Sequence, residues 1–165
     1  MNHTMNLTEQ IAKQLREVHF GDNWTWSTFK DHLTDVTWQQ ATTKVYSLNT
    51  IATLVYHMNY YLNKVSSVLE GNTAKTKHEL SFQHPSITSQ QDWEGLLEKT
   101  WADAETFAKR IEQMPEEKLW EAVSEEHGNY YRNIQGVIEH NHYHLGQIVF
   151  LKKIISETNK QDSSV

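Results

Sequence analysis

The amino-acid sequence predicts an all-α protein in which four amphipathic helices form a four-helix bundle. Apolar residues recur at intervals of three and four over four segments, and no segment shows a strong strand pattern. The 165 residues include six Trp, seven Tyr and five Phe, which is enough apolar area for one core, and no Cys for disulfides. We therefore expect a single domain over residues 1–165.

The first two predicted helices lie in the N-terminal part of the chain. The first has apolar positions at helical spacing and is expected to stop near Gly21; these positions are Leu7, Ile11, Leu15 and Val18. The second is predicted from Ile51 to Leu69, with Gly71 as its stop signal. Between them, residues 21–48 form a long connection, in which residues 27–33 are consistent with a short additional helix.

The third helix is predicted to open at Ser89, because Ser89 and Asp92 have the spacing of a capping box, and Pro115 ends it. Residues 71–88, before it, form the second long connection. Connections of this length permit neighbouring helices of a bundle to run parallel, and they often cover a site.

The last helix is expected to start near Asn133, and the irregular segment before it is consistent with a hairpin that turns at Gly128. Its apolar positions again follow helical spacing; they are Ile134, Val137, Ile138, Leu145, Ile148 and Ile155. The polar residues of this helix are therefore the ones that need a separate explanation.

Three histidines of the last helix lie within five positions. His140 and His144 are one turn apart on one flank of the apolar stripe, where two imidazoles can share a cation, whereas His142 projects from the opposite flank. His57, on a flank of the second helix, can add a third ligand. Three neutral imidazoles would leave a coordination position for water or substrate, as in catalytic sites. The alternative is that His140 and His144 are surface or interface histidines and that His57 is a core histidine bonded to a backbone carbonyl.

Other residues are candidates for the surroundings of such a site. Asn133 and Gln147 share the flank of His140 and His144, so we expect them to hydrogen-bond the histidine rings or metal-bound water. Three aromatic residues of the long connections are candidates for an apolar wall over the metal: Trp24, Trp26 and Phe82. The histidines without convergent spacing are expected to face solvent: His3, His19, His32, His78, His84 and His127.

Charge and hydropathy exclude several classes of partner. The net charge is −6 and Lys and Arg form no dense run, so we expect no nucleic-acid partner. The N-terminal segment lacks the apolar core of a signal peptide, and no apolar run is long enough to cross a bilayer, so a cytoplasmic protein without a membrane partner is expected. Exposed aromatic residues on a bundle would suit a homodimer.

Two histidine-containing segments resemble the DinB-like superfamily, which includes bacterial thiol transferases. One is the run His140, three residues, His144, Leu145, Gly146, Gln147; the other is the histidine of LVYHMNYY in the second helix. The resemblance covers nearly the whole chain. It implies a four-helix bundle with long crossovers and a divalent metal, commonly zinc or nickel, held by His57, His140, His144 and solvent. Characterised relatives include bacillithiol transferases and mycothiol-dependent isomerases, in which the metal is thought to activate a small-molecule thiol.

Three functional hypotheses follow. Because the chain contains no cysteine, a sulfur nucleophile has to be a cosubstrate, and the preferred hypothesis is a metal-dependent thiol transferase or related group-transfer enzyme acting on an electrophilic substrate. The second is a metal-dependent small-molecule hydrolase; peptidase activity is disfavoured because Asn141 follows His140 where the HExxH pattern has a glutamate. The third is a non-catalytic metal- or ligand-binding bundle.

Overall fold

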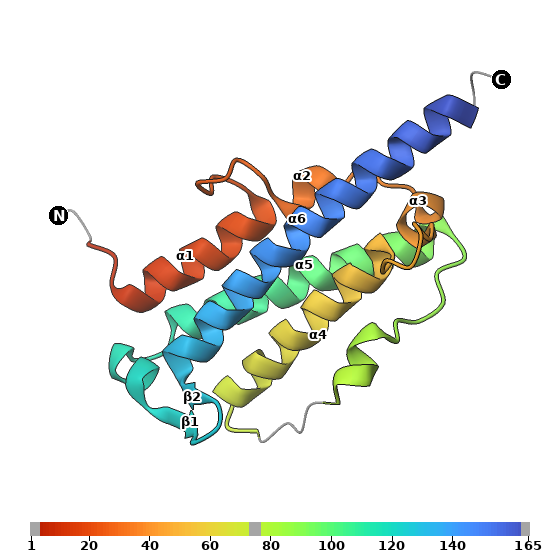
Figure 1. The fold of residues 1–165 in the computed structure, drawn as a ribbon. Helices are drawn as coiled ribbons and strands as arrows, with labels where there is room; N and C mark the ends of the chain where they lie inside the picture. The colour runs from red at the N-terminus through yellow and green to blue at the C-terminus, as the bar shows by residue number, and fades with distance from the viewer. Residues whose placement is uncertain (1–3, 73–76, 163–165) are drawn as a thin grey trace.

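Residues 4–72 and 77–162 are described in the computed structural model, and they are mainly helical (Figure 1). The long helices are α1 (Leu7–Phe20), α4 (Ile51–Leu69), α5 (Gln90–Glu112) and α6 (Tyr130–Asp162). The shorter elements are α2 (Phe29–Leu33), α3 (Trp38–Thr42), the 3-10 helices η1 (His78–Phe82) and η2 (Glu116–Trp120), and the strands β1 (Ala122–Ser124) and β2 (Gly128–Asn129). The expected dominance of helix is confirmed. Within these ranges, no helix combines the length and the apolarity needed to cross a membrane.

A polar side chain precedes each long helix and accepts a hydrogen bond from a backbone N–H of the first turn. These caps are Asn6, Thr50, Ser89 and Asn129. The predicted starts of the first three helices are confirmed. The start near Asn133 is wrong by three residues, because strand β2 leads directly into α6 and Asn129 caps the helix there.

The connections contain more regular structure than the sequence patterns indicated. The short helix expected within residues 27–33 is present as α2, whereas α3 was not predicted, although Thr37 and Gln40 form a capping box at its start. The expected hairpin is present as the antiparallel strands β1 and β2. Gly128 has φ of 68°, a left-handed conformation that glycine adopts without steric cost.

The long helices are arranged so that α1 and α4 each contact both α5 and α6. In Figure 1 the chain runs along α1 and α6 in one direction and along α4 and α5 in the opposite direction. The first long connection joins the end of α1 to the start of the antiparallel helix α4, whereas the second returns the chain to the end of the molecule from which α4 began, so that α5 runs parallel to α4. As a result, α4 and α6 lie side by side and antiparallel, with their middle turns adjacent.

Buried apolar side chains form two clusters rather than one continuous core. Three buried polar residues stand in sequence between members of the two clusters: Asn59 in α4, Thr100 in α5 and Asn141 in α6. His140 and His144 flank Asn141, and His57 precedes Asn59 by two positions. His140 therefore belongs to a polar level between two apolar clusters, and His57 and His144 lie next to this level, where their rings are held by well-packed helices.

Candidate metal centre

The three histidines of the predicted site converge. The Nε2 atom of His140 lies 3.1 Å from Nε2 of His57 and 3.0 Å from Nε2 of His144. Two nitrogen ligands of one ion, each at the usual metal–nitrogen distance of about 2.1 Å, lie about 3.0 to 3.4 Å apart. Taken as a set, His57, His140 and His144 each offer one ligand atom within 4.8 Å of the others, so one ion can contact all three.

Hydrogen bonds fix which nitrogen of His57 carries its proton. Ser81 is completely buried, and its hydroxyl donates to the backbone carbonyl of His78 at 2.6 Å. The Ser81 oxygen, 2.9 Å from Nδ1 of His57, is therefore left to accept the Nδ1 proton. His57 thus presents an Nε2 lone pair toward His140.

The same reasoning applies to His144, whose Nδ1 lies 2.7 Å from the carbonyl oxygen Oε1 of Gln147. An amide oxygen only accepts, so Nδ1 of His144 donates and its Nε2 also carries a lone pair. Supporting hydrogen bonds of this kind are usual for histidines that bind metals, because they fix both ring orientation and tautomer. Gln147 makes the ring contact that the sequence suggested.

His140 is the ring whose hydrogen bonding the described residues do not complete. Its Nδ1 is buried and has no hydrogen-bond partner among them, while its Nε2 faces the lone pairs of His57 and His144. A proton on Nε2 leaves the Nδ1 lone pair unsatisfied, and a proton on Nδ1 brings three lone pairs together. A cation at the point of convergence accepts all three lone pairs, so the donor set fits a metal ion.

Burial keeps these rings neutral. Desolvation, with a smaller contribution from the neighbouring histidines, lowers the pKa of His57 to about 4. Desolvation and His144 lower the pKa of His140 to about 4, and desolvation also lowers the pKa of His144. Metal ligation requires the neutral imidazole, and at neutral pH no proton has to be displaced from any of the three.

The aromatic residues proposed as an apolar wall separate into two groups. Phe82 stacks on His57, with ring centroids 4.3 Å apart and the planes inclined by 22°. Trp24 and Trp26 do not cover the site, because they are 94% and 91% exposed. They lie in the α1–α2 connection, which Asn23 holds folded through hydrogen bonds to the carbonyls of Glu17 and Ser27. The expectation for the two tryptophans is therefore wrong.

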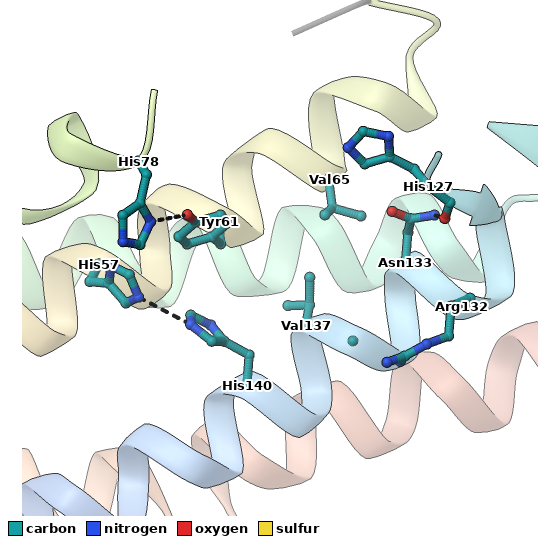
Figure 2. A pocket seen from close by; sticks show the side chains of 10 residues that line it. His57, Tyr61, Val65, His78, His127, Arg132, Asn133, Val137 and His140 are labelled. Atoms are coloured by element: carbon teal, nitrogen blue, oxygen red, sulfur yellow. Dashed lines mark hydrogen bonds between the residues drawn. The ribbon is translucent and has the colours of Figure 1, made fainter. Parts of the chain in front are cut away.

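A cavity of about 480 Å³ opens beside two of the three histidines, between α4 and α6 (Figure 2). It is lined by His57, Tyr61, Val65, His78, His127, Arg132, Asn133, Gly136, Val137 and His140. Asn133 belongs to this wall, but its amide donates to the carbonyls of His127 and Asn129 rather than to a ligand histidine, since it caps the hairpin that precedes α6.

Several histidines expected to be plain surface residues have other positions. His78 lines the cavity, and its Nδ1 lies 2.8 Å from the hydroxyl of Tyr61. His127 also lines it. His19 is 1% exposed and its Nδ1 donates to the carbonyl of Leu15 at 2.7 Å. His32 and His84 are half-buried, and His3 lies outside the described residues.

Sequence reasoning missed Ser81, Tyr61, His78 and Arg132. Tyr61 carried a usable signal, because it follows His57 by one helical turn and so lies on the same flank. The position of His19 was also readable, since it follows buried Leu15 by one turn. Ser81 and His78 belong to a connection without periodicity, and only the packing of η1 against α4 brings them to the site.

No protein-family model, curated protein or solved structure that was compared with this chain matches it. The function therefore has to be argued from the geometry of the site and from the chemistry of its residues.

Gln147 provides a direct test of the hydrogen bond that orients His144. Gln147→Leu is expected to weaken metal binding about tenfold, because loss of the acceptor frees the ring and its tautomer. Competition with a chromophoric chelator measures the affinity. Gln135→Leu, a matched change elsewhere on α6, is expected to leave the affinity unchanged; an affinity of Gln147→Leu within twofold of the parent would contradict the role.

Proposed function

We propose that this chain is a divalent-metal protein of the DinB-like type, a four-helix bundle with long connections, and that it acts as a metal-dependent thiol transferase or related group-transfer enzyme. The observation that carries the proposal is the convergence of the Nε2 atoms of His57, His140 and His144. The four long helices contact one another in a ring in which α4 runs parallel to α5 and α1 runs parallel to α6. This arrangement supports the fold assignment. A donor set of three neutral imidazoles accommodates zinc or nickel.

A divalent ion in this position supplies Lewis acidity, which lowers the pKa of a thiol or water that coordinates it. The chain's own residues orient the histidine rings and cover one of them with an apolar side chain. Ser81 and Gln147 hold two of the rings, and Phe82 covers one face of His57. The cavity beside the histidines has room for a small molecule.

One observation favours a thiol over water as the nucleophile. A sulfur nucleophile would have to enter as a cosubstrate, because the chain has no cysteine, and the cavity has room for it beside the histidines. Among the described residues that line the cavity, none is Asp or Glu, so the carboxylate that commonly serves as general base in metal-dependent hydrolysis is not in the wall. A thiol loses its proton more readily than water does and has less need of such a base.

A metal-dependent hydrolase is the second candidate. The observation in its favour is the pair formed by Tyr61 and His78, which lies beside His57 and offers a proton acceptor at the cavity wall. A non-catalytic metal-binding bundle is the third reading, and it predicts uptake of metal without turnover of any substrate.

The test uses zinc- and nickel-loaded protein with cysteine, glutathione, coenzyme A and bacillithiol as thiols and 1-chloro-2,4-dinitrobenzene as electrophile. We expect formation of the thioether with at least one thiol, at about ten times or more the rate given by a His140→Ala variant. Hydrolysis of p-nitrophenyl acetate without thioether formation would favour the hydrolase. Full metal occupancy without either reaction would leave the non-catalytic reading.

A further inference from the structure

The cavity has two chemically different ends. His57, His78 and His140 line one end, and Arg132, Asn133 and His127 line the other, with Val65 and Val137 between them (Figure 2). We propose that the far end binds a carboxylate of the small-molecule substrate or cosubstrate and that Arg132 is the residue that binds it. The inference rests on the proposed function for the histidine end, because it assumes that the other end of the same molecule reaches the metal.

The charge of the wall favours an anion. Among the described lining residues there are four histidines and one arginine, and no acidic side chain. Three neutral imidazoles leave the charge of a divalent ion uncompensated, so the histidine end becomes positive when metal is bound. A ligand with an anionic group therefore meets positive charge at both ends of the cavity when metal is bound.

The guanidinium of Arg132 lies close enough to the histidines for one small molecule to reach both. Arg132, Gly136 and His140 follow one another at intervals of four residues, on one face of α6. Nη1 of Arg132 lies 3.6 Å from the position that a Cβ atom on Gly136 would occupy, so the side chain lies along the helix over Gly136. Gly136 precedes His140 by about one turn, which is about 5 to 6 Å along the axis. This separation fits a molecule with two or three carbons between sulfur and carboxylate.

Arg132 retains donors for such a ligand. Its Nη1 is 3.1 Å from Oε2 of Glu139, and both side chains of this pair are 64% exposed. An exposed pair of this kind contributes little to stability, and Glu139 engages one of five N–H donors of the guanidinium. The other donors make no hydrogen bond to the described residues and can bind a carboxylate in bidentate fashion. Asn133 has both amide protons engaged and offers an acceptor, so the carboxylate belongs on the Arg132 side.

The first experiment compares 3-mercaptopropionate with 3-mercapto-1-propanol on cobalt-loaded protein, with the sulfur-to-cobalt absorption as readout. In the parent protein we expect the acid to bind about tenfold more tightly, the effect of one charge-assisted hydrogen-bonding contact. Arg132→Gln should remove this advantage. Arg110→Gln should keep it, because Arg110 pairs with Glu70 and does not line the cavity. Equal affinities of the acid and the alcohol for the parent protein would overturn the proposal. An advantage of the acid that persists in Arg132→Gln would overturn it as well, because the carboxylate would then bind the metal.

A second measurement decides the case in which neither thiol binds the metal. Metal-free protein labelled with nitrogen-15 is titrated with butyrate or with 1-butanol. NMR follows the Nε–H resonance of Arg132, which is assigned as the resonance that is missing from the Arg132→Gln spectrum. A saturable shift with butyrate alone would support the carboxylate site while the thiol-transferase proposal fails. An unmoved resonance in that case would overturn the carboxylate site as well.

Discussion

His140→Ala is expected to reduce the bound divalent metal from about one ion per chain to less than about a tenth of an ion. Nε2 of His140 is the nitrogen that lies within 3.1 Å of Nε2 of both other histidines, so its removal leaves two ligands on different helices and opens the centre of the site. Elemental analysis of untagged protein, after refilling with zinc or nickel and dialysis, measures the occupancy.

His142→Ala is the matched control for this change. His142 lies on the same helix two residues away and is half-buried, but it does not belong to the convergent set. We expect this variant to keep full occupancy, and circular dichroism should show both variants folded. Full occupancy in His140→Ala, or equal loss of metal in the two variants, would contradict the assignment of the ligands.

The helices and the histidine cluster could be predicted because both depend on short-range periodicity. Apolar spacing located α1 and α4 to the residue or nearly so, and the i and i+4 positions placed His140 and His144 on one face of α6. His57 required a further step, that its flank of α4 meets the same flank of α6. The antiparallel contact between these helices provides that step.

The residues around the ligands could not be predicted in the same way, because the paths of the connections depend on tertiary packing. Ser81 reaches His57 since η1 packs on α4, across a separation of 24 residues. Trp24 lies in a connection of similar composition but is turned to solvent. Both segments lack periodicity, so the sequence contains no signal that one returns to the site and the other leaves it.

The polar level between the two apolar clusters costs the protein stability. Asn59 and Asn141 are buried, and each retains a side-chain oxygen without a hydrogen-bond partner among the described residues. Such groups cost stability, and an apolar core at this level would be more stable. These polar groups lie beside the three converging histidines, and the apolar clusters on both sides are intact. The loss of stability is therefore localised at the proposed site, as is usual for functional sites.

Acidification should destabilise the metal-free protein through the same buried polar level, and His19 allows the effect to be measured apart from the metal ligands. Desolvation, opposed by the hydrogen bond to the Leu15 carbonyl and assisted by nearby His142, lowers the pKa of His19 to about 4. In the unfolded chain, histidine has a pKa of about 6.5. Between these values the unfolded state binds a proton that folded His19 does not. Stability is therefore full above about pH 6.5 and falls as the pH approaches 4.

For His19 alone, this linkage removes about 2 kcal/mol of the free energy of unfolding between pH 8 and pH 5. Urea unfolding with a chelator present measures the loss at each pH. His19→Asn keeps a donor for the Leu15 carbonyl but cannot titrate, so we expect it to lose about 2 kcal/mol less than the parent over this range, whatever its stability at pH 8. Gln135→Leu, which removes no titratable group, serves as the control and should lose as much as the parent. If the parent and His19→Asn lost equal stability on acidification, His19 would not be the buried neutral histidine that the geometry indicates.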